Sequence, residues 1–280
     1  MRLELKAHGA CNDAYYVETN DGEKYIIKVG RDSKEFQPQN SLLLEAKVAK
    51  QLQELQLSIP TPTIVFVSVD PEMYCYRYFE GVPMIQVWPT LSQQERLKVC
   101  QDLGKFHSEI GQNFTKAMAQ AIGLEIESTA YLHPEVEKEY HTMVTRSDLP
   151  DHIKVLAKTA KQIFDQTLHT GVFHFIHNDA HHENILIKNT TISGIIDFGE
   201  AMYGEVAKEF SRYIRDYPNY VEDIINAYEQ ASGNKLSRPR LISNALLSGL
   251  SDIIEAHQHG GEEQQNAEKM LKRYQEMLTK

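Results

Sequence analysis

Two short apolar runs near residue 190 constrain the fold of this chain more than any other part of its sequence. The runs are Ile185–Ile187 and Ile192–Ile196, and the polar residues Asn189-Thr190-Thr191 between them have the composition of a turn. This pattern predicts a β-hairpin. Asn184 stands just before the first strand and Asp197 just after the second, so we expect their side chains to lie next to each other at its open end.

Asp179 adds a second carboxylate to this end of the hairpin, because it lies in the loop that leads to the first strand. Two aspartates and one asparagine then converge without a local basic partner. Such a cluster is costly unless a cation or a substrate proton occupies it. Amide and carboxylate oxygens suit Mg²⁺, so the sequence predicts a magnesium site that includes Asn184 and Asp197.

The same segment resembles the aminoglycoside phosphotransferase and choline kinase families, which are relatives of the protein kinases. The stretch from His177 through Asp179 to Asn184 matches their HxDxxxxN catalytic loop, and Asp197-Phe198-Gly199 matches their metal-binding DFG-like motif. Those families place a short hairpin between the two motifs, as this chain does. The ordered pair at this spacing is far more specific than either motif alone.

The resemblance implies a role for each residue of the two motifs. Asp179 corresponds to the catalytic base that accepts or orients the substrate hydroxyl, and Asn184 and Asp197 correspond to the Mg²⁺ ligands that bridge the phosphates. His177 corresponds to a structural histidine that bonds to the backbone. The alternative interpretation is that these aspartates cap or solvate turns, which is the usual role of a loop aspartate.

The amino-terminal part of the chain predicts a small β-rich unit with one helix. Asn20-Asp21-Gly22 separates two runs rich in β-branched and aromatic residues and predicts a tight hairpin. Residues 40–57 carry apolar side chains at helical spacing, and residues 63–69 and 73–79 predict two more strands. After Gly81 the pattern is helical, interrupted by the hairpin at residues 185–196.

These elements predict an α+β, bilobed fold, and the resemblance implies that it is protein-kinase-like. We expect residues 1–80 to form the amino-terminal nucleotide-binding lobe and residues 81–280 to form a helical catalytic and substrate lobe. The helices expected in the second lobe span residues 92–110, 134–144, 151–169, 205–217, 220–232, 238–257 and 262–278.

Lys28 lies inside the apolar run from Tyr25 to Val29, where its amine must either extend to water or meet an anion. In the families that this chain resembles, a lysine of the third strand binds the α- and β-phosphates of the nucleotide. Glu45, on the next helix, matches the glutamate that holds this lysine. The alternative is a surface lysine and a solvated glutamate that do not meet.

Two further segments are candidates for nucleotide contacts. The turn around Gly9 and Ala10 could present backbone N–H groups to phosphate oxygens, although a plain hairpin turn is an equal alternative. The stretch from Tyr76 to Pro83, with Arg77 and Phe79, resembles the hinge whose backbone bonds the adenine or guanine edge. Its alternative is an ordinary strand that ends in a turn. The cofactors implied are Mg²⁺ and either ATP or GTP.

The charge of the chain restricts its partners. The formal net charge is -10, which repels phosphate backbones and attracts cations, so we expect a cationic small-molecule substrate and no nucleic acid. No apolar run is long enough to span a bilayer, and we expect no membrane partner. Three scattered cysteines favour a reducing compartment, so we predict a cytoplasmic protein, as a monomer or weak dimer.

The resemblance implies a phosphotransferase with an alcohol group as acceptor. It implies transfer of the γ-phosphate of ATP or GTP to a substrate hydroxyl. An aminoglycoside-type antibiotic is the first choice of substrate, which would make the protein an antibiotic-resistance enzyme. Choline, homoserine, an amino sugar or a macrolide are alternative acceptors. The family's Gly-Asp-Pro after the DFG-like motif is replaced here by Gly204-Glu205-Val206, and its later Asp-Leu by Glu209-Phe210.

Three other classes of protein are weaker alternatives. The histidines and acidic residues at positions 177 to 183 could indicate a metallohydrolase, but their spacing matches neither the HExxH nor the HxHxDH zinc motif. A protein Ser/Thr kinase would need a peptide-binding activation segment after Gly199, and the sequence turns helical there almost at once. A non-catalytic nucleotide-binding protein would lack part of the motif set, whereas this chain retains all of it.

Overall fold

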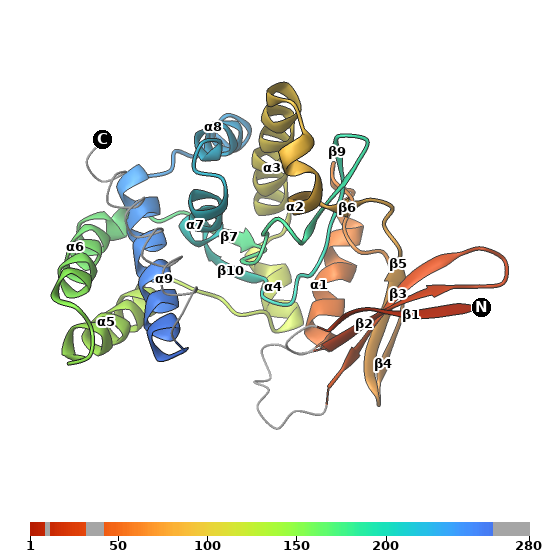
Figure 1. The fold of residues 1–280 in the computed structure, drawn as a ribbon, viewed down its shortest axis with the longest axis horizontal. Helices are drawn as coiled ribbons and strands as arrows, with labels where there is room; N and C mark the ends of the chain where they lie inside the picture. The colour runs from red at the N-terminus through yellow and green to blue at the C-terminus, as the bar shows by residue number, and fades with distance from the viewer. Residues whose placement is uncertain (9–11, 32–41, 260–280) are drawn as a thin grey trace.

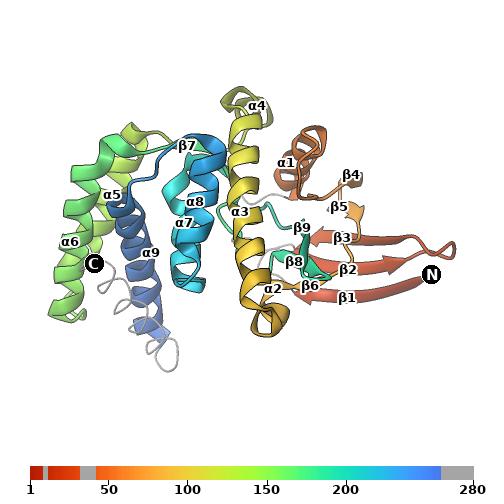
Figure 2. The same cartoon turned by 90° about the horizontal axis from the view of Figure 1, so that it is seen from above.

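The computed structural model describes residues 1–8, 12–31 and 42–259 of the 280-residue chain. A β-sheet with one helix forms one end of the molecule, and most of the other helices form the opposite end (Figure 1). The view from above shows the same division, with the sheet on the side of the amino terminus (Figure 2).

The sheet at the amino-terminal end is antiparallel and has five strands in the order β1-β2-β3-β5-β4. A tight turn joins β2 to β3, and Gly22 takes a φ of 86° there, as the sequence predicted for this hairpin. The bounds of the strands are β1 (Arg2–His8), β2 (Asn12–Glu18), β3 (Lys24–Gly30), β4 (Ile64–Val69) and β5 (Glu72–Arg77).

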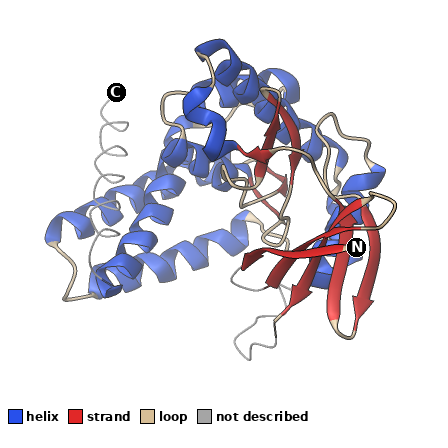
Figure 3. Cartoon of the chain, turned by 45° about the vertical axis from the view of Figure 1, so that its right-hand side comes forward, coloured by secondary structure: helices blue, strands red, loops and turns tan. Residues whose placement is uncertain are grey.

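Helix α1 (Leu42–Glu54) covers one face of this sheet. Figure 3 shows this helix beside the strands. Its apolar side packs on strand residues in a small core made by Leu42 and Ala46 of the helix with Ile26, Tyr74 and Tyr76 of the sheet. The helix also carries Glu45 on its buried side, although a carboxylate is costly there without a partner. The sheet and α1 together fix where that carboxylate points.

The chain passes from the sheet to the helical part through Gly81. This residue has a φ of 145°, and a Cβ atom at this position would lie 2.9 Å from the carbonyl oxygen of Ile187. Only glycine fits so close to the backbone of another strand. The crossing lets β6 (Val82–Pro83) pair with β8 (Ile185–Lys188), which pairs in turn with β9 (Thr191–Ile195).

The helical part surrounds a core that contains Phe106, Phe175 and Phe210. Helix α3 packs closely on α8 at Gly104, where a Cβ atom would lie 2.2 Å from the carbonyl oxygen of Ile224. The elements are α2 (Met84–Val87), η2 (Trp88–Thr90), α3 (Gln93–Asn113), α4 (Lys116–Ile122), α5 (Thr129–Thr145), α6 (Asp151–Thr167), η3 (Leu168–Thr170), β7 (Phe173–Ile176), β10 (Met202–Glu205), α7 (Val206–Asp216), α8 (Val221–Ser232) and α9 (Arg238–His259).

The structure departs from the sequence prediction in the helical part. The hairpin is not its only β-structure, because β7 and β10 form a second antiparallel pair in which Ile176 lies opposite Met202. These strands have four residues each, too few to show a clear period in the sequence. Helix α5 begins at Thr129, before Pro134, and α2 and α4 were not predicted. The helix predicted over residues 262–278 lies outside the described residues.

Among the described residues, the model contains no helix with both the length and the apolar character that crossing a membrane requires.

Candidate active site

The centre of the candidate site is an ion-pair cluster that joins the two ends of the molecule. The Nζ atom of Lys28 on β3 lies 2.8 Å from Glu45 Oε1 on α1 and 2.8 Å from Asp197 Oδ1, just beyond β9. Residues far apart in the sequence therefore meet at one ammonium group. The lysine side chain is 5% exposed and that of Glu45 is 3% exposed, so the alternative of a surface lysine and a solvated glutamate is wrong.

Electrostatics in this cluster favour the charged lysine. Burial opposes the charged form of Lys28, but the carboxylates of Glu45 and Asp197 outweigh it, and the pKa of the ammonium lies above its usual value. Burial raises the pKa of Glu45. Burial also works against the Asp197 carboxylate, yet Lys28 holds its pKa below the usual value. The side chain of Asp197 is still 45% exposed, so this carboxylate can reach a ligand.

The hairpin brings Asn184 and Asp197 to the same place, as the sequence predicted from its register. Ile185 lies opposite Ile195, and the backbone N–H of Ile196 donates to the carbonyl oxygen of Asn184 over 3.0 Å. Asp197 follows directly and takes a φ of 68°, a left-handed conformation that non-glycine residues adopt at a cost. Strain of this kind is common where a side chain is aimed at a ligand.

Asn184 connects the hairpin to the loop of Asp179. Its Nδ2 atom donates to the backbone carbonyl oxygen of Asp179 over 3.0 Å and lies 3.3 Å from Asp179 Oδ2. Because the amide hydrogens point toward Asp179, the amide oxygen of Asn184 is the atom left to act as a ligand. Together with the exposed carboxylate of Asp197, it offers the oxygen donors that Mg²⁺ prefers. The residues present therefore fit this ion.

His177 has the structural role that the resemblance implied. Its Nε2 atom donates to the carbonyl oxygen of Ile196 over 2.9 Å, while its Nδ1 atom accepts from the backbone N–H of Asp179 over 3.2 Å. The two bonds define one neutral tautomer, and burial lowers the pKa of this histidine. The imidazole thereby ties the loop of Asp179 to the strand that leads to Asp197.

A buried carboxylate on α7 supports the same loop. Glu209 accepts the backbone N–H of Asn178 at its Oε2 atom over 2.9 Å, and Asn178 has a φ of 63°. Its Oε1 atom is buried and has no hydrogen-bond partner within the described residues, and burial raises the pKa of Glu209 to about 7. The sequence contained a signal for this role, because Glu209 falls on the apolar face formed by Val206, Phe210 and Tyr213.

The basic partners of the two aspartates come from segments distant in the sequence. Besides Lys28 on Asp197, the structure brings Arg212 of α7 to Asp179, with 3.1 Å between Arg212 Nη2 and Asp179 Oδ1. The hairpin β8–β9 and the start of α7 separate Asp179 from Arg212 in the sequence. An arginine on a helix normally indicates a solvated face. The sequence therefore gave no signal for this pair.

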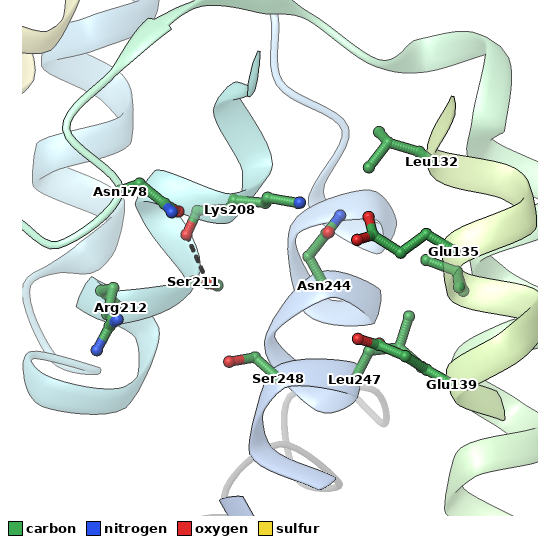
Figure 4. Close-up of a pocket in the computed structure, with 11 residues that line it drawn as sticks. Leu132, Glu135, Glu139, Asn178, Lys208, Ser211, Arg212, Asn244, Leu247 and Ser248 are labelled. Atoms are coloured by element: carbon green, nitrogen blue, oxygen red, sulfur yellow. Dashed lines mark hydrogen bonds between the residues drawn. The ribbon is translucent and has the colours of Figure 1, made fainter. Parts of the chain in front are cut away.

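A cavity of about 310 Å³ opens beside this loop, between helices α5, α7 and α9 (Figure 4). One wall carries Lys208, Ser211 and Arg212 of α7, and the opposite wall carries Glu135 and Glu139 of α5. Burial raises the pKa of both of these glutamates. Lys208 pairs with the buried Glu127, and Arg212 pairs with Asp179, so both cations of this wall already have a carboxylate partner.

Of the four other residues predicted to contact the nucleotide, Arg77 and Phe79 lie within the described residues. Gly9 and Ala10 lie outside the described residues. The side chain of Arg77 is 60% exposed and pairs with Glu23 over 3.0 Å. Phe79 packs on the hairpin, where a Cβ atom at Gly194 would lie 2.7 Å from its ring. Both residues lie on the segment that connects the sheet to the helical part, where the sequence predicted the hinge.

The histidines at positions 177, 181 and 182 do not converge on a common point. His181 Nε2 lies 3.6 Å from Asp179 Oδ2, whereas His182 Nδ1 lies 3.6 Å from Asp216, and His177 bonds to the backbone. Across residues 1–8, 12–31 and 42–259, no three His, Cys, Asp or Glu side chains are placed to bind one metal ion. The geometry therefore does not support the metallohydrolase alternative.

Comparison with known families and structures agrees with this geometry. The model of the phosphotransferase enzyme family matches residues 3–242. A search of curated protein sequences gave no match.

Several solved structures share the fold. A type I macrolide 2′-phosphotransferase is 16% identical with a TM-score of 0.73, over 96% of this chain and 90% of the other. The GDP complex of aminoglycoside 2′-phosphotransferase-IIIa is 15% identical with a TM-score of 0.74, over 100% and 93% of the two chains. The complex of APH(2″)-IIa with streptomycin and ATP is 17% identical with a TM-score of 0.68, over 100% and 92%. The kinase-like α+β fold predicted from the sequence is thus confirmed.

Proposed function

Because this chain belongs to the phosphotransferase enzyme family, we propose that it is a small-molecule kinase that transfers the γ-phosphate of ATP or GTP to a hydroxyl group of a cationic acceptor. The observation that carries the proposal is the meeting of Lys28, Glu45 and Asp197 at one ammonium, beside the loop of Asp179. Phosphoryl transfer needs this combination of a fixed cation for phosphates and a carboxylate for the acceptor.

The sheet end of the molecule, residues 1–80, would bind the nucleotide. Glu45 and Asp197 hold the Lys28 ammonium in a charged, buried position from which it can bind phosphate oxygens. Asn184 and Asp197 would hold Mg²⁺, which when bound neutralises charge on the phosphates. The GDP, ADP and ATP complexes of the structural neighbours support a nucleoside triphosphate as donor. Arg77, Phe79, Gly9 and Ala10 remain candidates for further nucleotide contacts.

The helical end would supply the acceptor chemistry. The acceptor oxygen attacks the γ-phosphorus, the bond from this phosphorus to the β–γ bridging oxygen breaks, and the hydroxyl proton passes to Asp179. The products are a phosphate ester and a nucleoside diphosphate. Asp179 contributes mainly by aligning the hydroxyl for an in-line attack, while Lys28 holds the phosphates in place. His177, Glu209 and Asn184 keep the loop of Asp179 in the required conformation.

The cavity beside Asp179 suits an acceptor that carries amines. Within the described residues, Glu135 and Glu139 have no ion-pair partner, whereas the two cations of the opposite wall are already paired. An ammonium group between these glutamates would stabilise their charged forms. Complexes of the structural neighbours contain streptomycin, kanamycin or gentamicin, so an aminoglycoside-type acceptor is the first choice. Such an enzyme would confer antibiotic resistance.

The free cysteines support a cytoplasmic location for this enzyme. Cys75 and Cys100 are both buried and unpaired, which is typical of proteins from a compartment that keeps thiols reduced. ATP and GTP are available in the same compartment.

The experiment that tests the proposal is a panel of alcohols assayed with ATP and with GTP in the presence of Mg²⁺. The panel contains streptomycin, kanamycin, gentamicin, an erythromycin-type macrolide, choline and homoserine, and the readout is release of nucleoside diphosphate above the rate without acceptor. We expect at least one amine-bearing alcohol to be phosphorylated. Release that no alcohol stimulates would contradict the proposal.

A second measurement examines the nucleotide end alone. Mg-ATP should raise the melting temperature of the wild-type protein, and the Asp197→Ala variant should lose this effect because a ligand of the ion and a partner of Lys28 are removed together. Equal stabilisation of both proteins by Mg-ATP would count against Asp197 as a metal ligand.

A further inference from the structure

Two basic residues of α7 line the acceptor cavity one helical turn apart, but their charges serve different partners. Lys208 forms an ion pair with Glu127, which is buried away from the cavity. Arg212 instead forms its ion pair with Asp179, the residue that would align the acceptor hydroxyl. Figure 4 shows both side chains on the α7 wall, opposite the glutamates of α5. Arg212 therefore links the cavity to the reacting carboxylate.

The ion pair uses only part of the guanidinium group. Nη2 lies 3.1 Å from Asp179 Oδ1, and the Arg212 side chain is 35% exposed. A guanidinium carries five N–H donors in a rigid planar fork, so it can bond two acceptor groups at once. Within the described part of the chain, Asp179 is the only ion-pair partner of Arg212. Donors on the cavity side of the group are thus placed to bind an oxygen of the acceptor.

The other oxygen of Asp179 defines where the reacting hydroxyl would lie. Oδ2 is 3.3 Å from the amide of Asn184, which the proposed function assigns to the metal site. A hydroxyl that bonds to Oδ2 would therefore lie on the side of Asn184, whereas Oδ1 is paired with Arg212. An oxygen on the carbon next to the reacting hydroxyl would face the Arg212 fork.

We propose that Arg212 is a specificity-determining residue, which binds a second oxygen of the acceptor, carried on a carbon adjacent to the one that is phosphorylated. By holding Asp179 with the same fork, it positions the reacting hydroxyl relative to that second oxygen. The inference rests on the proposed function and adds to it an acceptor class, namely alcohols with oxygens on neighbouring carbons, as in sugars and cyclitols.

The test is a cycle that changes the enzyme and the acceptor separately. The acceptor is the alcohol of the panel with the highest kcat/KM, whose phosphorylated position is located by NMR, and its analogue lacks the oxygen on the neighbouring carbon. For the wild type we expect the analogue to lose roughly 10- to 100-fold in kcat/KM, the range for a hydrogen bond to a charged group. With the full acceptor, the kcat/KM of the Arg212→Met variant should fall by a similar factor relative to the wild type. With the analogue, the kcat/KM values of the variant and the wild type should be nearly equal.

Two controls separate this role from a structural one. Arg215→Met makes the same chemical change on the same helix, at an arginine that pairs with Asp216, and should leave both acceptors unaffected. Stabilisation of Arg212→Met by Mg-ATP should equal that of the wild type, which shows that the nucleotide end is intact. The Arg212→Lys variant keeps the charge but loses the fork, and it should recover only part of the discrimination between the two acceptors.

The possible results are distinguishable. If Arg212→Met loses equally with both acceptors, or if the preferred alcohol has no oxygen on the neighbouring carbon, as in choline, the inference is wrong and the proposed function stands. If the wild type phosphorylates no alcohol, the proposed function fails and the inference fails with it.

Discussion

The two halves of the candidate site are built from the same kinds of residues in opposite environments. In the half proposed to bind the nucleotide, Lys28 and Glu45 form an ion pair whose side chains are 5% and 3% exposed. In the half proposed to bind the acceptor, Arg212 and Asp179 form an ion pair whose side chains are 35% and 24% exposed. The first pair is locked into the packing of a sheet against a helix, whereas the second lies at the edge of a cavity.

The difference corresponds to what each half would bind. Phosphates are the same in every nucleoside triphosphate, so a lysine held rigidly by two carboxylates can serve all of them. Acceptors must enter, be recognised and leave, and an exposed pair next to a cavity can exchange its hydrogen bonds with water and with ligand. Burial makes the first pair important for stability, since removing one partner of a buried pair leaves an uncompensated charge. The second pair should matter for turnover and little for folding.

The largest effect that separates the two halves is expected from Asp179→Ala. The acceptor would lose the group that aligns its hydroxyl, and kcat should fall by roughly 10²–10⁴. The affinity for Mg-nucleotide, measured by titration calorimetry, should remain nearly unchanged because Lys28, Glu45 and Asp197 are intact. Full activity of this variant would remove Asp179 from the mechanism, and a parallel loss of nucleotide affinity would show that the two halves are not independent.

The next effect concerns the buried pair. Lys28→Met leaves the Glu45 carboxylate buried without its partner, and we expect the free energy of unfolding to fall by about 3 kcal/mol, together with loss of nucleotide binding. The measurement is chemical denaturation followed by circular dichroism. The double variant Lys28→Met with Glu45→Leu removes both charges and should recover most of the stability but none of the nucleotide binding. A double variant as unstable as the single one would show that packing, and not the unpaired charge, causes the loss.

A third prediction concerns Glu209, below the acceptor half. The pKa of this carboxyl is raised to about 7, so between the ordinary glutamate pKa and pH 7 the folded protein binds a proton that the unfolded chain has lost. The free energy of unfolding should therefore contain a contribution that is full at low pH and decreases as the pH rises through 7. Glu209→Gln keeps an oxygen for the N–H of Asn178 but cannot ionise, and it should remove this decrease.

Between pH 5 and pH 8, the free energy of unfolding of the wild type should fall by on the order of 2–3 kcal/mol more than that of Glu209→Gln. Denaturation curves of both proteins at each pH give the comparison directly. Parallel stability profiles over this range would show that Glu209 is ionised in the folded protein at every pH tested.

The smallest of these effects is expected from His107, which lies in the core behind the acceptor half. Its Nε2 atom lies 2.7 Å from the hydroxyl of Tyr213, and burial lowers its pKa to about 3. Below the ordinary histidine pKa the unfolded chain gains a proton that the folded protein refuses, so the free energy of unfolding falls as the pH drops from 6.5. His107→Gln should make this fall shallower, by about 1.4 kcal/mol at pH 5.5. An unchanged slope would mean that the imidazole is protonated in the fold.

The contact between Lys28 and Glu45 was implied by the family resemblance, whereas the other contacts that the sequence predicted correctly follow from local spacing. The hairpin of residues 185–196 predicted that Asn184 and Asp197 are neighbours because strand register follows from the turn. The membership of the phosphotransferase family was likewise recognisable, because its two motifs are separated only by that hairpin, and the family match confirms it. The buried position of Glu209 could have been predicted from the apolar period of its helix.

What the sequence determined by itself is therefore the kind of fold and the family, since both are encoded in short patterns of polarity and turn residues. Only the tertiary structure decided which charges line the cavity and which partner Asp179 has there. Arg212 reaches Asp179 because α7 packs beside the catalytic loop, and Glu135 and Glu139 face the same cavity because α5 lies across from α7. The physical reason is that the packing of separate helices fixes such contacts, and no periodicity within one segment records how two helices are placed relative to each other.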